Sequence, residues 1–231
     1  TAVGLAANVY TVTVTDQNNC SGSTSVTITE PSAVSLTTSI TSNYNGVSIS
    51  CNGACDGEIT ANASGGVGAY TYVWSNAQTN ALATGLCAGG YSVTAADGNG
   101  CTITSSITIT EPPAVTASSV STDASCNGLA DGTATASGAG GIGNFSYTWS
   151  TVPPQTTASA TGLNATISVY TATVSDGNGC SDVTSVTITE PTPVTATIAT
   201  TPVNCNGGDD GVATVTAGGG TPGVPTYTYD F

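Results

Sequence analysis

The residues of this chain that could do chemistry are eight cysteines and 14 carboxylates, and no Lys, Arg or His accompanies them. Without His or Lys, a Ser or Cys nucleophile has no general base of the usual kind, and no imidazole can bind a metal. Without Lys or Arg, no side chain can pair with phosphate groups, so we expect no binding to nucleic acid or to an anionic membrane surface. Disulfide formation and cation binding are the chemistry that remains.

The cysteine spacing fits neither a zinc site nor a redox CxxC pair. In a chain rich in Thr and Gly, it indicates disulfides and an oxidising, extracellular setting at the cell surface. The chain has no apolar run long enough to cross a bilayer and no basic signal-peptide region. We therefore expect no direct membrane insertion, and we expect secretion and attachment to depend on sequence outside this segment.

The elements that must position these residues recur along the chain. The string Thr-Glu-Pro ends at Pro31, Pro112 and Pro191, about 80 residues apart, as expected for tandem copies of one small domain. A Cys-Asn-Gly-x-x-Asp-Gly segment and an Asp/Asn/Gly turn that ends in Cys recur three times each with the same spacing. The segments lie at 51–57, 126–132 and 205–211, and the turns end at Cys20, Cys101 and Cys180.

Between these landmarks, apolar and polar residues alternate with a period of two, which predicts strands with one buried face and one Thr/Ser face. The turns at 97–100 and 176–179 tolerate positive φ and indicate hairpins. Nothing is typical of a helix. Roughly seven short strands per copy, with Trp74 and Trp149 in the core on the third, predict an all-β chain of tandem immunoglobulin-like antiparallel β-sandwich repeats, forming an elongated rod or filament.

Five landmarks in constant order resemble the SprB-type repeat of gliding-motility adhesins. They are the Cys-Asn-Gly-x-x-Asp-Gly segment, the Tyr-x-Tyr-x-Trp-Ser strand at 70–75, the Gly-Leu and Tyr strand, the Asp-Gly-Asn-Gly-Cys turn and the closing Thr-Ile-Thr-Glu-Pro. The resemblance covers the whole chain. It implies immunoglobulin-like or PKD-like modules in a giant secreted protein, displayed at the cell surface and in contact with a substratum or polysaccharide, and it assigns no ligand site to any one repeat.

Aligning the copies predicts two complete repeats flanked by two half repeats. The complete repeats are 32–112 and 113–191, the C-terminal half is 1–31, and the N-terminal half is 192–231. One interpretation is a window cut from a longer chain. The other is a protomer that polymerises by half-domain complementation, with residues 192–231 of one copy completing a sandwich with residues 1–31 of the next.

Cys55 and Cys87 occur only in the repeat at 32–112, and the next repeat has Ala130 and Asn164 at the matching positions. Because the two cysteines appear and vanish together, we expect them to be bonded to each other.

The repeated cysteines leave two alternatives. With immunoglobulin-like strand order, Cys51 and Cys101 lie at opposite ends of one domain, roughly 20 Å apart, whereas the Cα atoms of a disulfide lie within about 7 Å. That order predicts an interdomain bond between Cys51 and Cys180, and it leaves the other repeated cysteines to pair with domains outside this sequence. If the first strand is short or the order differs, intradomain Cys51–Cys101 and Cys126–Cys180 bonds are expected instead.

The same junction would gather oxygen ligands. Asp56, Glu111, Asp176 and Asn178 could bind Ca²⁺ and stiffen the joint, since no cationic side chain is present to pair with the carboxylates. The alternative is that Asp-Gly and Asn-Gly only form turns and that Glu-Pro only ends a strand. No other cofactor is expected.

Asn62, Asn144 and Asn164 begin Asn-x-Ser/Thr sequons and are glycosylation candidates, although this short pattern is frequent by chance in Thr/Ser-rich sequence.

Together these features predict a structural or adhesive repeat segment of an extracellular surface filament or giant adhesin. Its expected partners are neighbouring copies of itself in a fibre and a polysaccharide or abiotic surface. The alternative is a carbohydrate-binding accessory module of a larger secreted protein. An enzyme is not expected, because paired carboxylates for glycoside cleavage would have to lie among turn residues that recur in every repeat.

Overall fold

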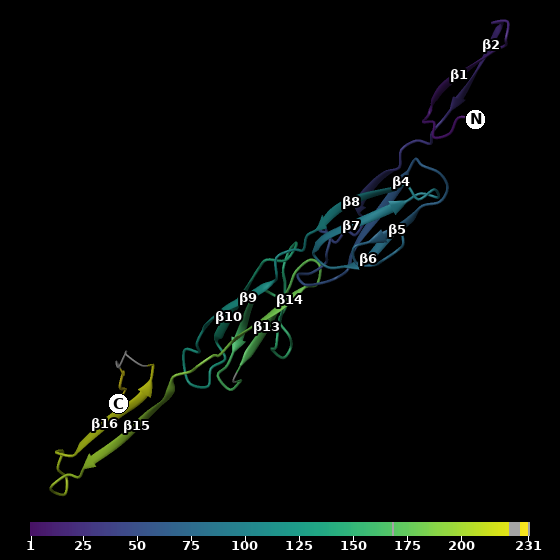
Figure 1. Ribbon diagram of the computed structural model, residues 1–231. Coiled ribbons are helices and arrows are strands. Elements are labelled where there is room, and N and C mark those ends of the chain that lie inside the picture. The colour runs from purple at the N-terminus through teal and green to yellow at the C-terminus, as the bar shows by residue number, and fades with distance from the viewer. Residues whose placement is uncertain (168, 222–226, 231) are drawn as a thin grey trace. The chain divides into compact units, whose positions relative to one another are not determined.

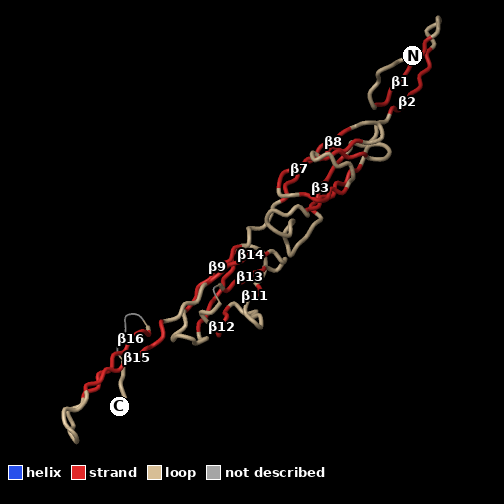
Figure 2. The backbone as a smooth tube through the Cα atoms, turned by 90° about the horizontal axis from the view of Figure 1, so that it is seen from below, coloured by secondary structure: helices blue, strands red, loops and turns tan. Residues whose placement is uncertain are grey.

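Every regular element in the part of the chain that is described is a β-strand. The computed structural model describes residues 1–167, 169–221 and 227–230 (Figure 1), and Figure 2 shows strands joined by loops throughout these ranges. The prediction of an all-β chain is confirmed. The chain divides into two units, Thr1–Ser42 with Cys55–Thr110 and Asn43–Ala54 with Glu111–Phe231.

The first unit contains a sandwich of two three-stranded antiparallel sheets. One sheet has the order β3-β4-β6 and the other the order β5-β7-β8. This is the immunoglobulin arrangement, in which the first, second and fourth strands face the third, fifth and sixth. The strands are β3 (Ser35–Ile40), β4 (Gly57–Ser64), β5 (Thr71–Trp74), β6 (Leu82–Leu86), β7 (Gly89–Ala96) and β8 (Thr102–Ile109).

The second unit contains a sandwich with the same connectivity. Its sheets have the orders β12-β10-β9 and β11-β13-β14. The strands are β9 (Thr116–Thr122), β10 (Gly132–Ala139), β11 (Ser146–Trp149), β12 (Ser159–Leu163), β13 (Tyr170–Ser175) and β14 (Ser181–Val186). Each sandwich thus has six strands rather than the seven expected, because the chain passes from the third to the fourth through a loop without a further strand.

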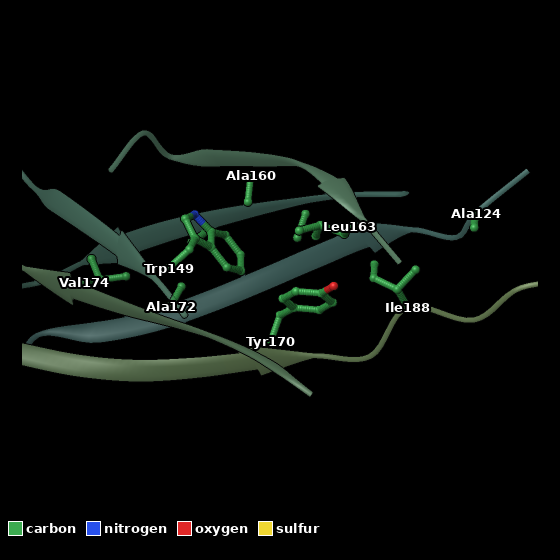
Figure 3. Packing of buried hydrophobic residues seen from close by; sticks show 10 residues of the cluster. Ala124, Trp149, Ala160, Leu163, Tyr170, Ala172, Val174 and Ile188 are labelled. Carbon is green, nitrogen blue, oxygen red and sulfur yellow. The ribbon is translucent and has the colours of Figure 1, made fainter. Parts of the chain in front are cut away.

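The core of each sandwich follows the two-residue alternation of the sequence. In the second sandwich, Trp149 and Tyr170 are the largest fully buried side chains, and Figure 3 shows them between the sheets with Leu163 and Ile188 nearby. The Tyr170 hydroxyl donates to the carbonyl of Asn164 at 3.1 Å, so its one polar atom is satisfied. Both tryptophans lie on the third strand of their sandwich and are buried, as predicted.

Two further hairpins form two-stranded sheets. Strands β1 (Asn8–Thr15) and β2 (Ser21–Ile28) pair with each other, and so do β15 (Thr192–Thr201) and β16 (Val212–Gly220). By the repeat alignment, β1 and β2 correspond to the last two strands of a sandwich, and β15 and β16 to the first two. Several of their large apolar side chains are exposed.

None of the residues that the structure describes form a helix long and apolar enough to cross a membrane.

Candidate functional site

The most specific cluster of interactions surrounds the β13–β14 turn in the second unit. Residues 43–54 precede β4 in the sequence, yet they belong to this unit. A disulfide joins Cys51 of that segment to Cys180 of the turn, with 5.7 Å between the two Cα atoms, a normal separation for a disulfide. The segment is thereby tied to a turn 129 residues further along the chain.

Asn178 adds hydrogen bonds beside this disulfide. Its amide nitrogen donates to the carbonyl oxygens of Ser50, at 3.0 Å, and Tyr44, at 3.4 Å. Its side-chain oxygen accepts from the amide of Asn45 at 2.5 Å. Ile49 of the same segment is fully buried. Residues 43–54 are therefore held by a covalent bond, polar contacts and a buried apolar side chain together.

The turn that carries Cys180 is built around the carboxylate of Asp176, which is 6% exposed. One carboxylate oxygen accepts from the backbone N–H groups of Asn178 and Cys180, both at 2.9 Å, and the other accepts from that of Ile142 at 2.8 Å. Because three N–H donors converge on this one side chain, the position of the cysteine is fixed by Asp176. The aspartate of the Asp-Gly-Asn-Gly-Cys pattern therefore positions the cysteine as well as forming the turn.

A second carboxylate shapes the loop on the other side of the disulfide. Glu111 accepts a hydrogen bond from the backbone N–H of Gly53 at 2.6 Å, and the Asn52 amide donates to the carbonyl of Pro112 at 3.1 Å. These contacts bind the Cys-Asn-Gly loop to the closing Glu-Pro of the same repeat. Sequence reasoning missed these hydrogen bonds, although the joint recurrence of Cys-Asn-Gly and Glu-Pro in both complete repeats could have indicated them.

Binding of Ca²⁺ by Asp56, Glu111, Asp176 and Asn178 stays a prediction. Within the described part of the chain, no group of three or more His, Cys, Asp or Glu side chains could hold a metal ion. Asp56 belongs to the first unit, while Glu111, Asp176 and Asn178 belong to the second. The Glu111 and Asp176 carboxylates accept hydrogen bonds from backbone N–H groups.

Comparison with known families identifies the repeat. A family model described as the SprB repeat matches residues 43–79, 118–153 and 197–230. The chain carries SprB repeats. Each match contains one Cys-Asn-Gly segment, so the loop that bears Cys51 lies inside the first match. The resemblance inferred from the landmarks is confirmed. The segment is a structural repeat of a surface adhesin, which lies at the cell surface or outside the cell.

Two solved structures are similar to this chain of SprB repeats in part. One is a tetra-tandem repeat in the extending region of a large adhesion protein, with 16% identity, a TM-score of 0.23, and coverage of 93% of this chain and 71% of that chain. The other is an amphioxus IgVJ-C2 molecule, with 14% identity, a TM-score of 0.25, and coverage of 70% and 98%. No curated protein matches the chain.

The remaining cysteines of the SprB repeats divide into one bonded pair and four thiols. Cys55 and Cys87 form a disulfide within the first unit, with a Cα separation of 3.9 Å. The intradomain alternatives do not form, because Cys51 and Cys180 are bonded to each other while Cys101 and Cys126 are free. The exposed free thiols are Cys20, Cys101, Cys126 and Cys205.

The three candidate glycosylation sites lie in different surroundings. Asn62 is an exposed residue of β4, and Asn144 is exposed in the loop before β11. Asn164 is half-buried, and its side-chain oxygen accepts hydrogen bonds from the N–H and hydroxyl of Thr166. Glycosylation of Asn62 and Asn144 is therefore sterically simpler than that of Asn164, and it stays a prediction.

Backbone hydrogen bonds lower the pKa of several aspartates in the SprB repeats. The hydrogen bond from the N–H of Val67 is the largest cause of the lowered pKa of Asp97. The hydrogen bond from the N–H of Ala117 is the largest cause of the lowered pKa of Asp182. The pKa values of three other carboxyls are lowered as well, those of Asp123, Asp131 and Asp210.

We expect acid to destabilise the repeats through these carboxylates. Since their pKa values are lower in the folded than in the unfolded chain, the unfolded chain binds more protons as the pH falls below about 4, and the stabilisation present at neutral pH is lost there. Thermal unfolding followed by circular dichroism should give a constant Tm between pH 5 and 7 and a falling Tm from about pH 4 to pH 2. Measurements in 0.5 M NaCl screen general repulsion between carboxylates. A Tm that rises on acidification in this buffer would contradict the prediction.

Proposed function

We propose that this segment is a load-bearing, non-enzymatic spacer of a surface adhesin, and that the Cys51–Cys180 disulfide carries tension past most of the chain. The supporting observation is the sequence separation of 129 residues between the two bonded cysteines. When the chain is pulled from residues 1 and 231, force runs from Cys51 directly to Cys180. Strands β4 to β13 lie inside the closed loop, so neither sandwich can be fully extended while the disulfide is intact.

Composition supports a role outside the cell. The chain has no Lys or Arg, so trypsin-like proteases find no cleavage site. Its formal charge of -14 disfavours close approach to anionic surfaces. The surface it would contact is a polysaccharide or an abiotic substratum, and repetition of one module would supply reach and valency rather than one deep binding site.

Single-molecule pulling tests the load path. In the oxidised state the disulfide keeps 129 residues from being extended, so reduction should lengthen the fully extended chain by about 45 nm. The chain should be attached at residues 1 and 231 and stretched to its contour length with and without a reductant. Equal contour lengths in both states would refute the proposed function.

The second disulfide supplies a matched control. A variant with Cys55→Ser and Cys87→Ser lacks a bond that lies wholly inside the loop closed by Cys51 and Cys180. Its oxidised contour length should equal that of the unmodified chain, whereas Cys180→Ser should lengthen it. Binding of the isolated segment to a specific glycan on an array would instead favour the carbohydrate-binding accessory module.

A further inference from the structure

The first complete repeat is longer than the second in the connection between its first strand and its cysteine. Val34 and Val115 each directly precede the first strand of a repeat. Cys51 comes 17 residues after Val34, whereas Cys126 comes 11 residues after Val115, so the first repeat has six additional residues here. We call residues 43–50 of this connection the insert segment.

The insert segment contains a small hairpin of its own. The backbone N–H of Tyr44 donates to the carbonyl of Val47 at 2.8 Å, and the N–H of Val47 donates to the carbonyl of Tyr44 at 3.2 Å. Asn45 and Gly46 form the turn, with φ of 51° and 91°. Asn-Gly with positive φ at both residues is typical of the type I′ turn that two-residue hairpins favour. The local sequence therefore determines the shape of this hairpin.

The hairpin contacts the β13–β14 turn through two amide side chains. The Asn45 amide nitrogen donates to the side-chain oxygen of Asn178 at 2.5 Å and to the carbonyl of Gly177 at 3.3 Å. The Asn178 amide nitrogen donates to the carbonyls of Tyr44 at 3.4 Å and Ser50 at 3.0 Å. Because an amide group has two N–H donors, each of these side chains uses its full donor capacity in the contact. These four hydrogen bonds do not require the disulfide.

The turn holds Asn178 in place through contacts of its own. The carboxylate of Asp176, which is 6% exposed, accepts from the backbone N–H of Asn178 at 2.9 Å. The N–H of Gly179 donates to the carbonyl of Asp176 at 3.1 Å. Neither bond involves the insert segment or Cys51. The backbone around Asn178 is therefore ordered before the segment arrives, which keeps the entropic cost of docking low.

We propose that the insert segment docks on the β13–β14 turn without the Cys51–Cys180 disulfide, and that Asn178 is the residue that the segment recognises. The occupant of this surface is thus a segment of the chain itself. Docking places Ser50, and with it Cys51, beside the turn that carries Cys180, so the disulfide closes a contact that is already made. Docking in the resting chain does not depend on the load-bearing role.

Closing the bond requires an oxidant, and oxidised glutathione is sufficient. The thiols of Cys51 and Cys180 lose two protons and two electrons and form one S–S bond, while the S–S bond of glutathione breaks and two glutathione thiols form. Docking itself has no covalent step. It can therefore be measured in a chain in which both cysteines are replaced.

Hydrogen exchange tests docking in the full chain with Cys51→Ser and Cys180→Ser. A two-stranded hairpin is at best marginally stable by itself in water, so the N–H groups of Tyr44 and Val47 should be protected only while the segment is docked. We expect NMR to show that both exchange at least about tenfold more slowly than in an unstructured chain. Exchange at the unstructured rate would overturn the proposal, and it would leave the contour lengths expected with and without the disulfide unchanged.

Asn178→Ala in the same background tests the recognition. This variant loses two donors and one acceptor at the contact, so the protection of the two N–H groups should fall about tenfold. Asn144→Ala is the matched control, because Asn144 is exposed and follows Gly143, where a Cβ would lie 3.4 Å from the Cα of Gly177 in the same turn. It should change the protection less than about twofold. Equal effects would overturn the proposal, and unchanged unfolding of the two complete sandwiches shows that both variants are folded.

Asn45→Gly tests the same contact from the insert segment. Glycine accepts the positive φ of this position, so the turn is kept while two donors are lost. The protection should fall about fivefold. Combined with Asn178→Ala, the loss should be smaller than the product of the two single losses, because both substitutions remove the same Asn45–Asn178 hydrogen bond. A combined loss equal to that product would mean that the two side chains act separately, and it would overturn recognition of Asn178 by the segment.

Discussion

Replacing Trp149 with alanine should lower the free energy of unfolding of the second sandwich by about 3–5 kcal/mol. The side chain is 1% exposed and fills the space between the two sheets (Figure 3). Its indole N–H donates to the carbonyl of Thr157 at 3.1 Å, so truncation also leaves a polar group unpaired. Denaturant unfolding followed by circular dichroism measures this loss. Trp74 fluorescence reports separately on the first sandwich, whose transition should not move.

Two further substitutions show that the loss comes from packing. Trp149→Phe keeps most of the aromatic volume and should cost less than half as much as Trp149→Ala. Val152→Ala changes a side chain that is 96% exposed and should leave the unfolding transition unchanged. If Trp149→Phe were as destabilising as Trp149→Ala, the buried volume of the indole would not be the cause.

Gly140→Ala should destabilise the same sandwich by about 3 kcal/mol, through the backbone rather than the core. Gly140 has a φ of +74°, and a Cβ at this position would overlap the carbonyl oxygen of Ala114. A left-handed conformation alone costs an alanine roughly 1–2 kcal/mol. The overlap adds to this cost, because a backbone atom of the neighbouring segment has to move. Denaturant unfolding followed by tryptophan fluorescence in a Trp74→Phe background, which leaves Trp149 to report on the second sandwich, measures the effect.

Gly179→Ala is the matched control for this prediction. Gly179 has a φ of +85°, and a Cβ there would meet no atom within 4 Å. Gly179→Ala should therefore lower the free energy of unfolding only by the conformational strain of about 1–2 kcal/mol. The difference between the two variants isolates the close approach at Gly140. Equal losses would mean that the backbone next to Gly140 is not tightly packed.

The strands and their buried faces could be predicted because they depend on local pattern. Alternation with a period of two assigns Trp74 and Val93 to the inside from their neighbours in the chain alone. The turn at 97–100 joins β7 to β8, as its Asp-Gly-Asn-Gly composition indicates. The repeated landmarks were sufficient to recognise the SprB repeat.

The count of strands was less predictable. The sequence suggested roughly seven per repeat from the immunoglobulin pattern, while each sandwich has six. Residues 75–81 join the third strand to the fourth, and whether such a stretch pairs with a sheet edge depends on the neighbouring sheet rather than on its own composition.

The candidate site depended most on tertiary structure. Sequence alone determined that Cys51 and Cys180 are equivalent to the other repeated cysteines, but it left two sets of pairings open. Only the fold decides between them, because a disulfide requires Cα atoms within about 7 Å and the 5.7 Å separation here joins residues 129 positions apart. The same holds for Glu111 and Asp176. Their carboxylates accept hydrogen bonds from the backbone N–H groups of Gly53 and Ile142, which lie 58 and 34 residues away along the chain, so no local pattern could pair them.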